Sequence, residues 1–340
     1  MFGHYDALPS AYPATVPPSK RARLRPLGLH SDDTQQALAL LAVCLAGWSP
    51  GAWARCLVDG AKKHAWRGTG HHFDTAVKKL THGTTPQQAG SPSAGIGAAM
   101  RTAPLGALYR DQSRKLVEVA LESSAMTHAD LRSIALAYAV AWTSAQLVNG
   151  KSTASVRAEL PDAVAEAEDE WLHGKTAWSV DRAGRHQLSL GLARVLAAMP
   201  EDVTALGPVV VRLALPFIDA KQAPAGPAHP NHAFALLGGL YGLCAALVDD
   251  VEPMAALLAI IRQGEDTDTV AAIAGGILGA RFGAAWVPKD RVLDAARIEA
   301  YAHALVNRTA APETVDALVQ TEAALTAREN AFQADPTWPR

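Results

Sequence analysis

Apolar residues recur at helical spacing along almost the whole chain, and this pattern constrains the fold more than any other feature. Leu38, Leu41 and Leu45 follow one another at steps of three and four residues, so they share one face of a helix. Alternation of β-branched and polar residues, the pattern of a half-buried strand, is nearly absent. The sequence therefore predicts an all-α protein. Further helices are expected over residues 134–148, 156–173, 189–199, 203–217, 254–262, 270–282, 291–306 and 312–332.

Charge and apolar content exclude several classes of protein. The 31 basic and 33 acidic side chains leave a net charge of −2, which argues against a broad nucleic-acid surface. The longest apolar run without charge, residues 233–248, is shorter than the about 20 residues that span a bilayer. Residues 1–20 lack the apolar core of a signal peptide. The three cysteines lie far apart, without metal or redox spacing. We expect a cytoplasmic protein that does not enter a membrane.

The longest segment without helical pattern is 82–97, which is rich in glycine, proline and serine. Such a long loop within a compact domain is usually functional or mobile. The adjacent pair His71-His72 is typical of a solvated loop. No shift in composition divides the chain, so residues 1–340 are expected to form one domain, with C-terminal helices extending to about residue 333.

Two acidic clusters lie near opposite ends of this chain, each directly ahead of a helical pattern. The first is Ser31-Asp32-Asp33-Thr34 and the second is Asp266-Thr267-Asp268-Thr269. Helix capping explains one oxygen-bearing side chain at each position, but not four in a row. Together the clusters offer only hard oxygen donors, which suit Mg²⁺ or Mn²⁺ rather than zinc. Several carboxylates in one site would repel one another without a cation, so a shared site predicts a metal.

A glycine-bearing loop, SPSAGIGAAMRTAPLG at residues 91–106, is the third candidate feature. The Gly95-x-Gly97 spacing would let backbone N–H groups approach a phosphate. The pattern alone has little specificity.

The motifs together resemble the ADP-ribosylglycohydrolase family. The chain carries SDDTQQALAL, WRGTGHHFDTAVKKL, SAGIGAAMRTAPLG, MTHADLRSIALAYAVA and GEDTDTVAAIAGGILGARFG in the family's order, over about residues 6–283. The resemblance implies a compact, single-domain helical bundle with a central metal cleft. It also implies a dinuclear Mg²⁺ or Mn²⁺ centre that cleaves ADP-ribose from an acceptor.

The resemblance also assigns roles to residues of this chain. The implied metal ligands are Ser31, Asp32, Asp33, Asp266, Asp268 and Thr269. The implied substrate-binding residues are Gly95, Ile96, Gly97, Met100 and His128. Asp33 or Asp268 would be catalytic, by accepting a proton from the attacking water or holding it in line.

The chain departs from the family pattern at three places. The family's N-terminal glycine-aspartate-alanine-leucine-glycine segment, which ends in a catalytic-site glutamate, corresponds to Tyr5-Asp6-Ala7-Leu8-Pro9, and the glutamate position falls near Pro13. Ile96 replaces a loop asparagine that would contact the ligand. Glu265 stands where glycine or another small residue is common.

The sequence therefore predicts a metal-dependent hydrolase of the bond between ADP-ribose and an acceptor, with an arginine-type N-glycosidic linkage on a protein as the leading hypothesis. Two alternatives stay open. The altered residues favour either a glycosidase acting on a small, NAD-derived ribosyl metabolite or a catalytically weak ADP-ribose-binding relative. The expected partner is an ADP-ribosylated protein under the leading hypothesis and a ribosyl small molecule under the metabolite alternative.

Overall fold

The computed structural model describes residues 26, 28–174, 177–218 and 226–333. Within these ranges the chain is helical and contains no sheet strand, only three isolated backbone bridges. The all-α prediction is confirmed. The helices are α1 (Asp32–Gly47), α2 (Pro50–Lys62), α3 (His71–Thr81), α4 (Pro86–Ala89), η2 (Ala99–Arg101), α5 (Ala103–Leu108), α6 (Ser113–Ala125), α7 (Leu131–Val148), α8 (Thr153–Gly174), α9 (Gln187–Ala197), α10 (Val203–Ala214), η3 (Leu215–Phe217), η4 (Ala235–Gly239), α11 (Leu240–Ala245), α12 (Pro253–Ile261), α13 (Thr267–Phe282), η5 (Lys289–Arg291), α14 (Ala295–Asn307) and α15 (Val315–Gln333).

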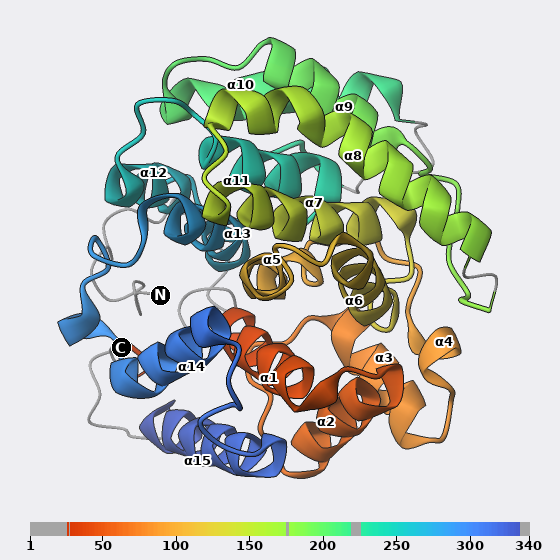
Figure 1. Ribbon diagram of the computed structural model, residues 1–340, viewed down its shortest axis with the longest axis vertical. Coiled ribbons are helices and arrows are strands. Elements are labelled where there is room, and N and C mark those ends of the chain that lie inside the picture. The colour runs from red at the N-terminus through yellow and green to blue at the C-terminus, as the bar shows by residue number, and fades with distance from the viewer. Residues whose placement is uncertain (1–25, 27, 175–176, 219–225, 334–340) are drawn as a thin grey trace.

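Helix α7 forms the centre of the core. It carries alanine, leucine and valine on every side and is buried along nearly its whole length, as expected for a helix without a polar face. It packs against α5, α6, α8 and α13. In Figure 1, α8, α9 and α10 form the upper layer, α7, α11 and α13 cross the middle, and α1, α2, α14 and α15 form the lower part.

The two ends of the described chain pack together. Helix α1 contacts α13, α14 and α15 although more than 200 residues of sequence separate them. The contact between α1 and α13 brings the two acidic clusters, each at the N-terminus of its helix, to one region of the fold.

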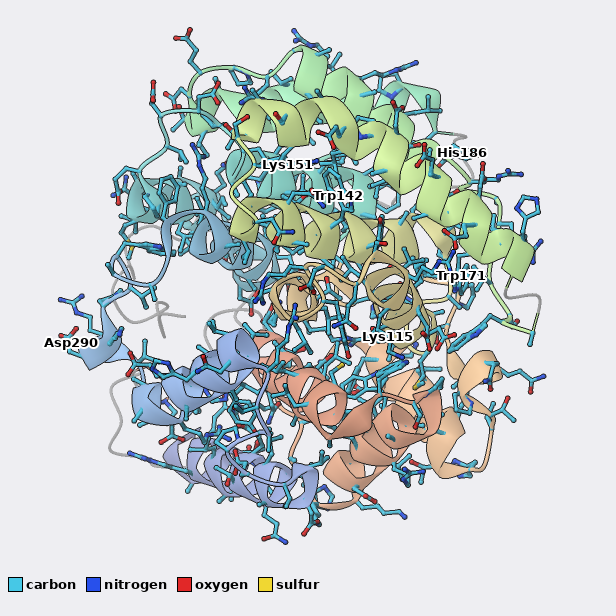
Figure 2. All side chains as sticks on the ribbon, viewed as in Figure 1. Lys115, Trp142, Lys151, Trp171, His186 and Asp290 are labelled. Carbon is cyan, nitrogen blue, oxygen red and sulfur yellow. The ribbon has the colours of Figure 1, made fainter. Side chains whose placement is uncertain are left out.

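Many charged side chains lie at the surface of this bundle, and Figure 2 shows Asp290 of η5 at its edge. Lys151 lies in the connection between α7 and α8. The Lys151 ammonium lies 5.9 Å from the centroid of the Trp142 ring. Among the described residues, no helix is both long enough and apolar enough to cross a membrane.

The helices predicted from periodicity are present, with shifted ends, but shorter ones escaped prediction. Residues 48–51 contain a serine, a proline and a glycine, which are typical of a turn, yet α2 begins here: Ser49 accepts a hydrogen bond from the Ala52 amide, and Pro50 occupies the first helical position. Proline is well tolerated there because its missing N–H would have no partner in the helix. The prediction that His71-His72 lies in a loop is wrong, because both residues form the first turn of α3.

Candidate active site

The first acidic segment begins α1. Ser31 makes no capping hydrogen bond; its hydroxyl donates instead to Asp33 Oδ2 at 2.5 Å. One turn further along, the Gln36 amide donates to Asp32 Oδ2 at 3.3 Å. Ser31, Asp32 and Asp33 are all buried. Side-chain capping by Ser31 therefore does not explain why these oxygen-bearing residues stand here.

The second acidic segment begins α13 after a tight turn. Gly264 and Glu265 both adopt left-handed backbone angles, with φ of 79° and 63°. Because a side chain is disfavoured in that region, this geometry gives a physical reason for the small residue that is common at the Glu265 position. The buried Asn231 stabilises the turn. Its side-chain Nδ2 donates to the Gly264 carbonyl at 2.9 Å, and its backbone carbonyl accepts from the Asp266 N–H at 3.1 Å.

The carboxylates of the two segments influence one another. Burial raises the pKa of Asp266 well above its ordinary value, and the nearby negative charges of Asp268 and Asp33 raise it further, against a hydrogen bond with Thr269 that lowers it. Asp33 and Asp266 come from opposite ends of the chain. Their electrostatic repulsion therefore indicates that the fold brings their carboxylates close together.

One cavity of about 810 Å³ unites most of the predicted site. This volume lies within the range typical of small-molecule sites. Nine predicted site residues line it: Asp32, Gly95, Ile96, Gly97, Met100, His128, Asp266, Asp268 and Thr269. Ser31 and Asp33 do not line the cavity and are buried beside Asp32. The segment around Tyr5–Pro9 and Pro13 lies outside the described residues.

Isolated backbone bridges hold the glycine loop in the cavity wall. Ser91 pairs with His128, and Gly95 pairs with Phe234. A Cβ atom at Gly97 would lie 3.1 Å from His128 Nε2, which is closer than ordinary van der Waals contact, so a side chain there would require the imidazole or the loop to shift by a few tenths of an ångström. Ile96 is fully buried and adds an apolar side chain to the lining of the cavity.

A buried chain of hydrogen bonds connects the acidic side of the cavity to His128. Asp32 accepts from Gln36, whose carbonyl oxygen accepts from Arg101 Nη1 at 2.6 Å. Arg101 Nη2 donates to Thr127 Oγ1 at 2.8 Å, and this hydroxyl lies 2.9 Å from His128 Nδ1. Burial lowers the pKa of His128 to about 3, with further lowering by the charges of Arg101 and His72. His128 is therefore an uncharged hydrogen-bonding group at neutral pH.

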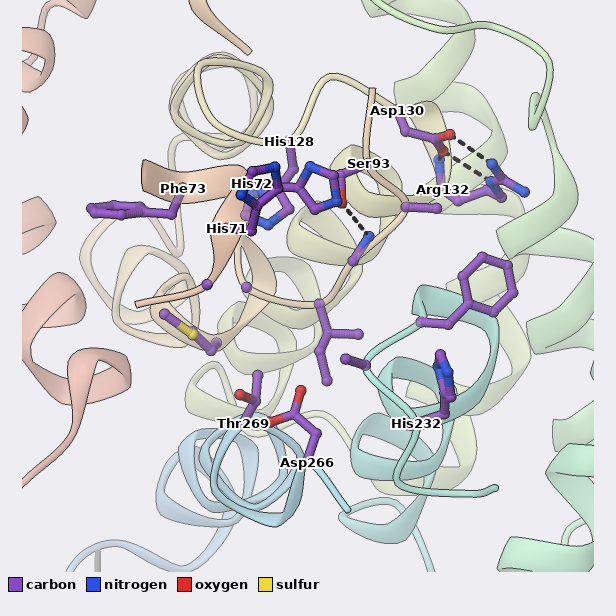
Figure 3. Close-up of a pocket in the computed structure, with 18 of the residues that line it drawn as sticks. His71, His72, Phe73, Ser93, His128, Asp130, Arg132, His232, Asp266 and Thr269 are labelled. Carbon is purple, nitrogen blue, oxygen red and sulfur yellow. Dashed lines mark hydrogen bonds and ion pairs between the residues drawn. The ribbon is translucent and has the colours of Figure 1, made fainter. Parts of the chain in front are cut away.

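An ion pair between Arg132 and Asp130 lies at the far end of the cavity. The Arg132 guanidinium donates to Asp130 through Nε at 2.9 Å and through Nη2 at 2.6 Å, and it also lies over the Phe234 ring at 5.4 Å from the centroid. Figure 3 shows this pair across the cavity from Asp266.

Sequence reasoning missed several residues of the lining. They include Gln36, His71, His72, Asp130, Arg132, Asp181, His232 and Phe234. Most belong to the motif blocks that carry the family resemblance, which was the available signal. Asp181, His232 and Phe234 lie outside those blocks, and nothing in the local pattern pointed to them.

Comparison with known proteins identifies the family. Residues 5–314 match the family model described as ADP-ribosylglycohydrolase. The chain belongs to the ADP-ribosylglycohydrolase family. The match extends beyond residue 283, where the motif resemblance ended, and stops just before α15.

Two relatives are consistent with membership of the ADP-ribosylglycohydrolase family. The uncharacterized protein YegU of Escherichia coli strain K12 is 28% identical over 198 residues, which are 55% of this chain and 50% of that protein. The chain thus matches about half the length of this curated relative. A solved structure of an ADP-ribosylglycohydrolase-related protein complex aligns with a TM-score of 0.55 and 19% identity, covering 87% of this chain and 90% of that one. The structural likeness supports the same fold.

The acidic side of the cavity has the donor chemistry of a hard divalent cation. Asp32, Asp266, Asp268 and Thr269 supply carboxylate and hydroxyl oxygens from two helix N-termini, and Mg²⁺ and Mn²⁺ favour such ligands. As the side chains stand, no three or more His, Cys, Asp or Glu residues in the described ranges form a group that could hold a metal ion. The residue types fit a metal, and the ligand set stays a prediction.

Proposed function

We propose that this protein hydrolyses the glycosidic bond between ADP-ribose and an acceptor, with an arginine-type N-glycosidic linkage on a protein as its substrate. One observation carries the proposal. In a chain of the ADP-ribosylglycohydrolase family, Asp32 and the second acidic segment, more than 230 residues further along, line one cavity together with the glycine loop and His128.

The proposed reaction needs a divalent cation at the acidic side of the cavity. Ser31, Asp32 and Asp33 would hold it from α1, and Asp266, Asp268 and Thr269 from α13. A bound pair of Mg²⁺ or Mn²⁺ ions supplies Lewis-acid chemistry at the ribose. Gathered carboxylates that raise the pKa of Asp266 support this assignment, because a cation would relieve their repulsion.

Of the two candidate proton acceptors, Asp268 is better placed than Asp33. Asp268 lines the cavity, whereas Asp33 is buried outside the lining and accepts from Ser31. A general base must reach the proton that it removes, so we assign Asp268 to the attacking water. Negative charge on the same side would stabilise the positive charge that develops at the anomeric carbon.

The rest of the lining would bind and orient the substrate. Met100 and Ile96 offer apolar contact, and the uncharged His128 offers a hydrogen bond that the Arg101 chain holds in position. Because Arg101 and Gln36 link Asp32 to His128, both sides of the ribose site would be positioned by one buried network.

Release of arginine from ADP-ribosyl-arginine tests the proposal. With Mg²⁺ or Mn²⁺ the protein should release ADP-ribose, and with EDTA it should not. The variant Asp266→Asn should abolish turnover, while Asp162→Asn, a matched change at an exposed position of α8, should retain it. If the protein hydrolyses a small riboside but not ADP-ribosyl-arginine, its substrate is a ribosyl metabolite rather than an ADP-ribosylated protein. Full activity in the Asp266→Asn variant would refute the site.

A further inference from the structure

Residues 231–235 form a joint segment between two parts of the candidate site. His232 and Phe234 line the cavity, and the first residue of the segment, Asn231, is fully buried. The backbone carbonyl of Asn231 accepts from the Asp266 N–H at 3.1 Å, so the joint segment is bonded directly to the second acidic segment. Figure 3 shows His232 and Asp266 on the same side of the cavity.

The other end of the joint segment is bonded to the glycine loop. The Ala235 N–H donates to the Ala94 carbonyl at 2.8 Å, and Phe234 pairs with Gly95 through an isolated backbone bridge. The joint segment is therefore held by the cavity wall at one end and contacts the second acidic segment at the other. It can serve as a fixed anchor for whatever is bonded to it.

The turn before Asp266 needs such an anchor. Gly264 and Glu265 stand one after the other in the left-handed region of backbone angles, which is disfavoured for a glutamate. Strained backbone of this kind persists only where the surrounding structure fixes it. The direction of the Asp266 side chain follows the backbone of the turn, so whatever holds the turn also positions this carboxylate.

The side chain of Asn231 provides the anchor. Its Nδ2 donates to two carbonyls, that of Ile260 in the last turn of α12 at 2.8 Å and that of Gly264 at 2.9 Å. Because both neighbours are hydrogen-bond acceptors, only the NH₂ group of the amide can face them. The amide oxygen, Oδ1, is buried without a hydrogen-bond partner among the described residues. The side chain of Asn231 therefore acts through its two N–H donors.

The position of the turn affects more than one predicted ligand. Asp266, Asp268 and Thr269 line the cavity from the same helix start, so a shift of the turn would move all three relative to Asp32 of α1. A residue that orients metal ligands without touching the metal typically changes metal affinity about 10- to 100-fold when it is altered.

We propose that Asn231 is a positioning residue of the candidate site: its amide fixes the turn before Asp266 and so holds the second acidic segment in place for a cation. This inference rests on the proposed function, because it takes Asp266, Asp268 and Thr269 as cation ligands. Asn231 does not line the cavity, so it acts through these residues rather than on the substrate.

Binding of Mn²⁺ alone tests the proposal, because it requires neither the substrate nor the reaction. The dissociation constant is measured by electron paramagnetic resonance for the unaltered protein, for Asn231→Asp, and for Asn231→Ala, which removes both donors without burying a charge. Asn149→Asp is the matched control: Asn149 is exposed, does not line the cavity, and donates through Nδ2 to the Arg110 carbonyl at 2.8 Å. Val164→Ala, at a fully buried position of α8, is the control for lost stability alone. Circular dichroism melting is recorded for every variant.

Both Asn231 variants should bind Mn²⁺ about 10- to 100-fold more weakly than the unaltered protein. Asn149→Asp should keep its affinity, and Val164→Ala should melt at a lower temperature but bind Mn²⁺ equally well. If Asn231→Asp does not fold, Asn231→Ala gives the result. Unchanged affinity in a folded Asn231 variant, an equal loss in Val164→Ala, or no Mn²⁺ binding by the unaltered protein would overturn the inference.

Failure of the proposed function looks different. In that case the Asn231 variants would still lose Mn²⁺ affinity, but the unaltered protein would not cleave ADP-ribosyl-arginine. Cleavage by the unaltered protein together with unchanged Mn²⁺ affinity in the Asn231 variants would refute the positioning role alone.

Discussion

The variant Glu322→Gln offers a quantitative test of how the first acidic segment is held. Glu322 of α15 is fully buried. Its carboxylate accepts from Arg67 Nη2 at 2.8 Å, from Gln35 Nε2 at 3.1 Å and from His30 Nε2 at 3.2 Å, and it is also paired with Arg297. His30 and Gln35 flank Ser31, Asp32 and Asp33 in the sequence. Glu322 therefore ties α15, beyond the family match, to the start of α1.

The expected magnitude follows from the charges around Glu322. Burial alone would raise the pKa of Glu322, but the His30 hydrogen bond and the charges of His30, Arg67 and Arg297 lower it from 4.5 to about 2. Burial also lowers the pKa of His30, so the two arginines supply the positive charge at neutral pH. A lowering of this size corresponds to about 3 kcal/mol of stability above pH 4.5.

Replacing Glu322 by glutamine should therefore lower the free energy of unfolding by about 3 to 5 kcal/mol at pH 7, because two buried guanidinium groups lose their carboxylate. A depressed pKa stabilises the protein above the unfolded-state value, and this stabilisation is lost as the pH falls through the folded-state value. The difference between the unaltered protein and the Glu322→Gln variant should shrink between pH 4.5 and pH 2.

Urea unfolding at pH 7, 4 and 3 measures this difference. The matched control is Glu299→Gln, which removes an exposed carboxylate paired with Lys289 and should leave stability nearly unchanged. A loss below about 1 kcal/mol at pH 7, or an equal loss at pH 7 and pH 3, would refute the reasoning.

Three further predictions concern α13 and the turn that precedes it. The variant Glu265→Gly should raise stability by up to about 1 kcal/mol in chemical unfolding, because glycine accepts the left-handed backbone there, and Glu265→Ala should give no such gain. The variant Gly276→Ala should cost about 1 to 3 kcal/mol, because a Cβ at that position would lie 2.5 Å from the Ala103 Cβ, whereas Gly279→Ala on the same helix meets nothing within 4 Å and should not destabilise; equal effects would contradict this packing. Mg²⁺ at 100 times its dissociation constant should stabilise the protein by about 2.7 kcal/mol in thermal unfolding, and an Asp266→Asn variant that keeps this gain would exclude Asp266 as a ligand.

Helical periodicity was sufficient to predict the fold class, because the apolar residues of α7 and α8 recur at three- and four-residue spacing. Residues at that spacing share one face of a helix but not one face of a strand. It failed at α2 and α3, where glycine, proline and adjacent histidines at the helix start look like a loop. Proline is favourable at the first position of a helix, so a proline marks either a helix start or a loop according to its position.

The acidic clusters were predictable as candidates because four oxygen-bearing side chains exceed the needs of a helix cap. Their meeting in one cavity was an inference from charge and resemblance, and the contact between α1 and α13 accounts for it. The meeting of His72 and His128 was not predictable from local pattern. They are 56 residues apart in the sequence, yet both line the cavity, with ring centroids 6.5 Å apart.

The central claim is that the two acidic segments form one cation-dependent ribose site. Calorimetric titration of ADP-ribose into the protein, once with excess Mg²⁺ and once with EDTA, tests it most directly. The account predicts saturable binding with Mg²⁺, none with EDTA, and none for Asp266→Asn under either condition. Binding of equal affinity with Mg²⁺ and EDTA, or undiminished binding by Asp266→Asn, would contradict it.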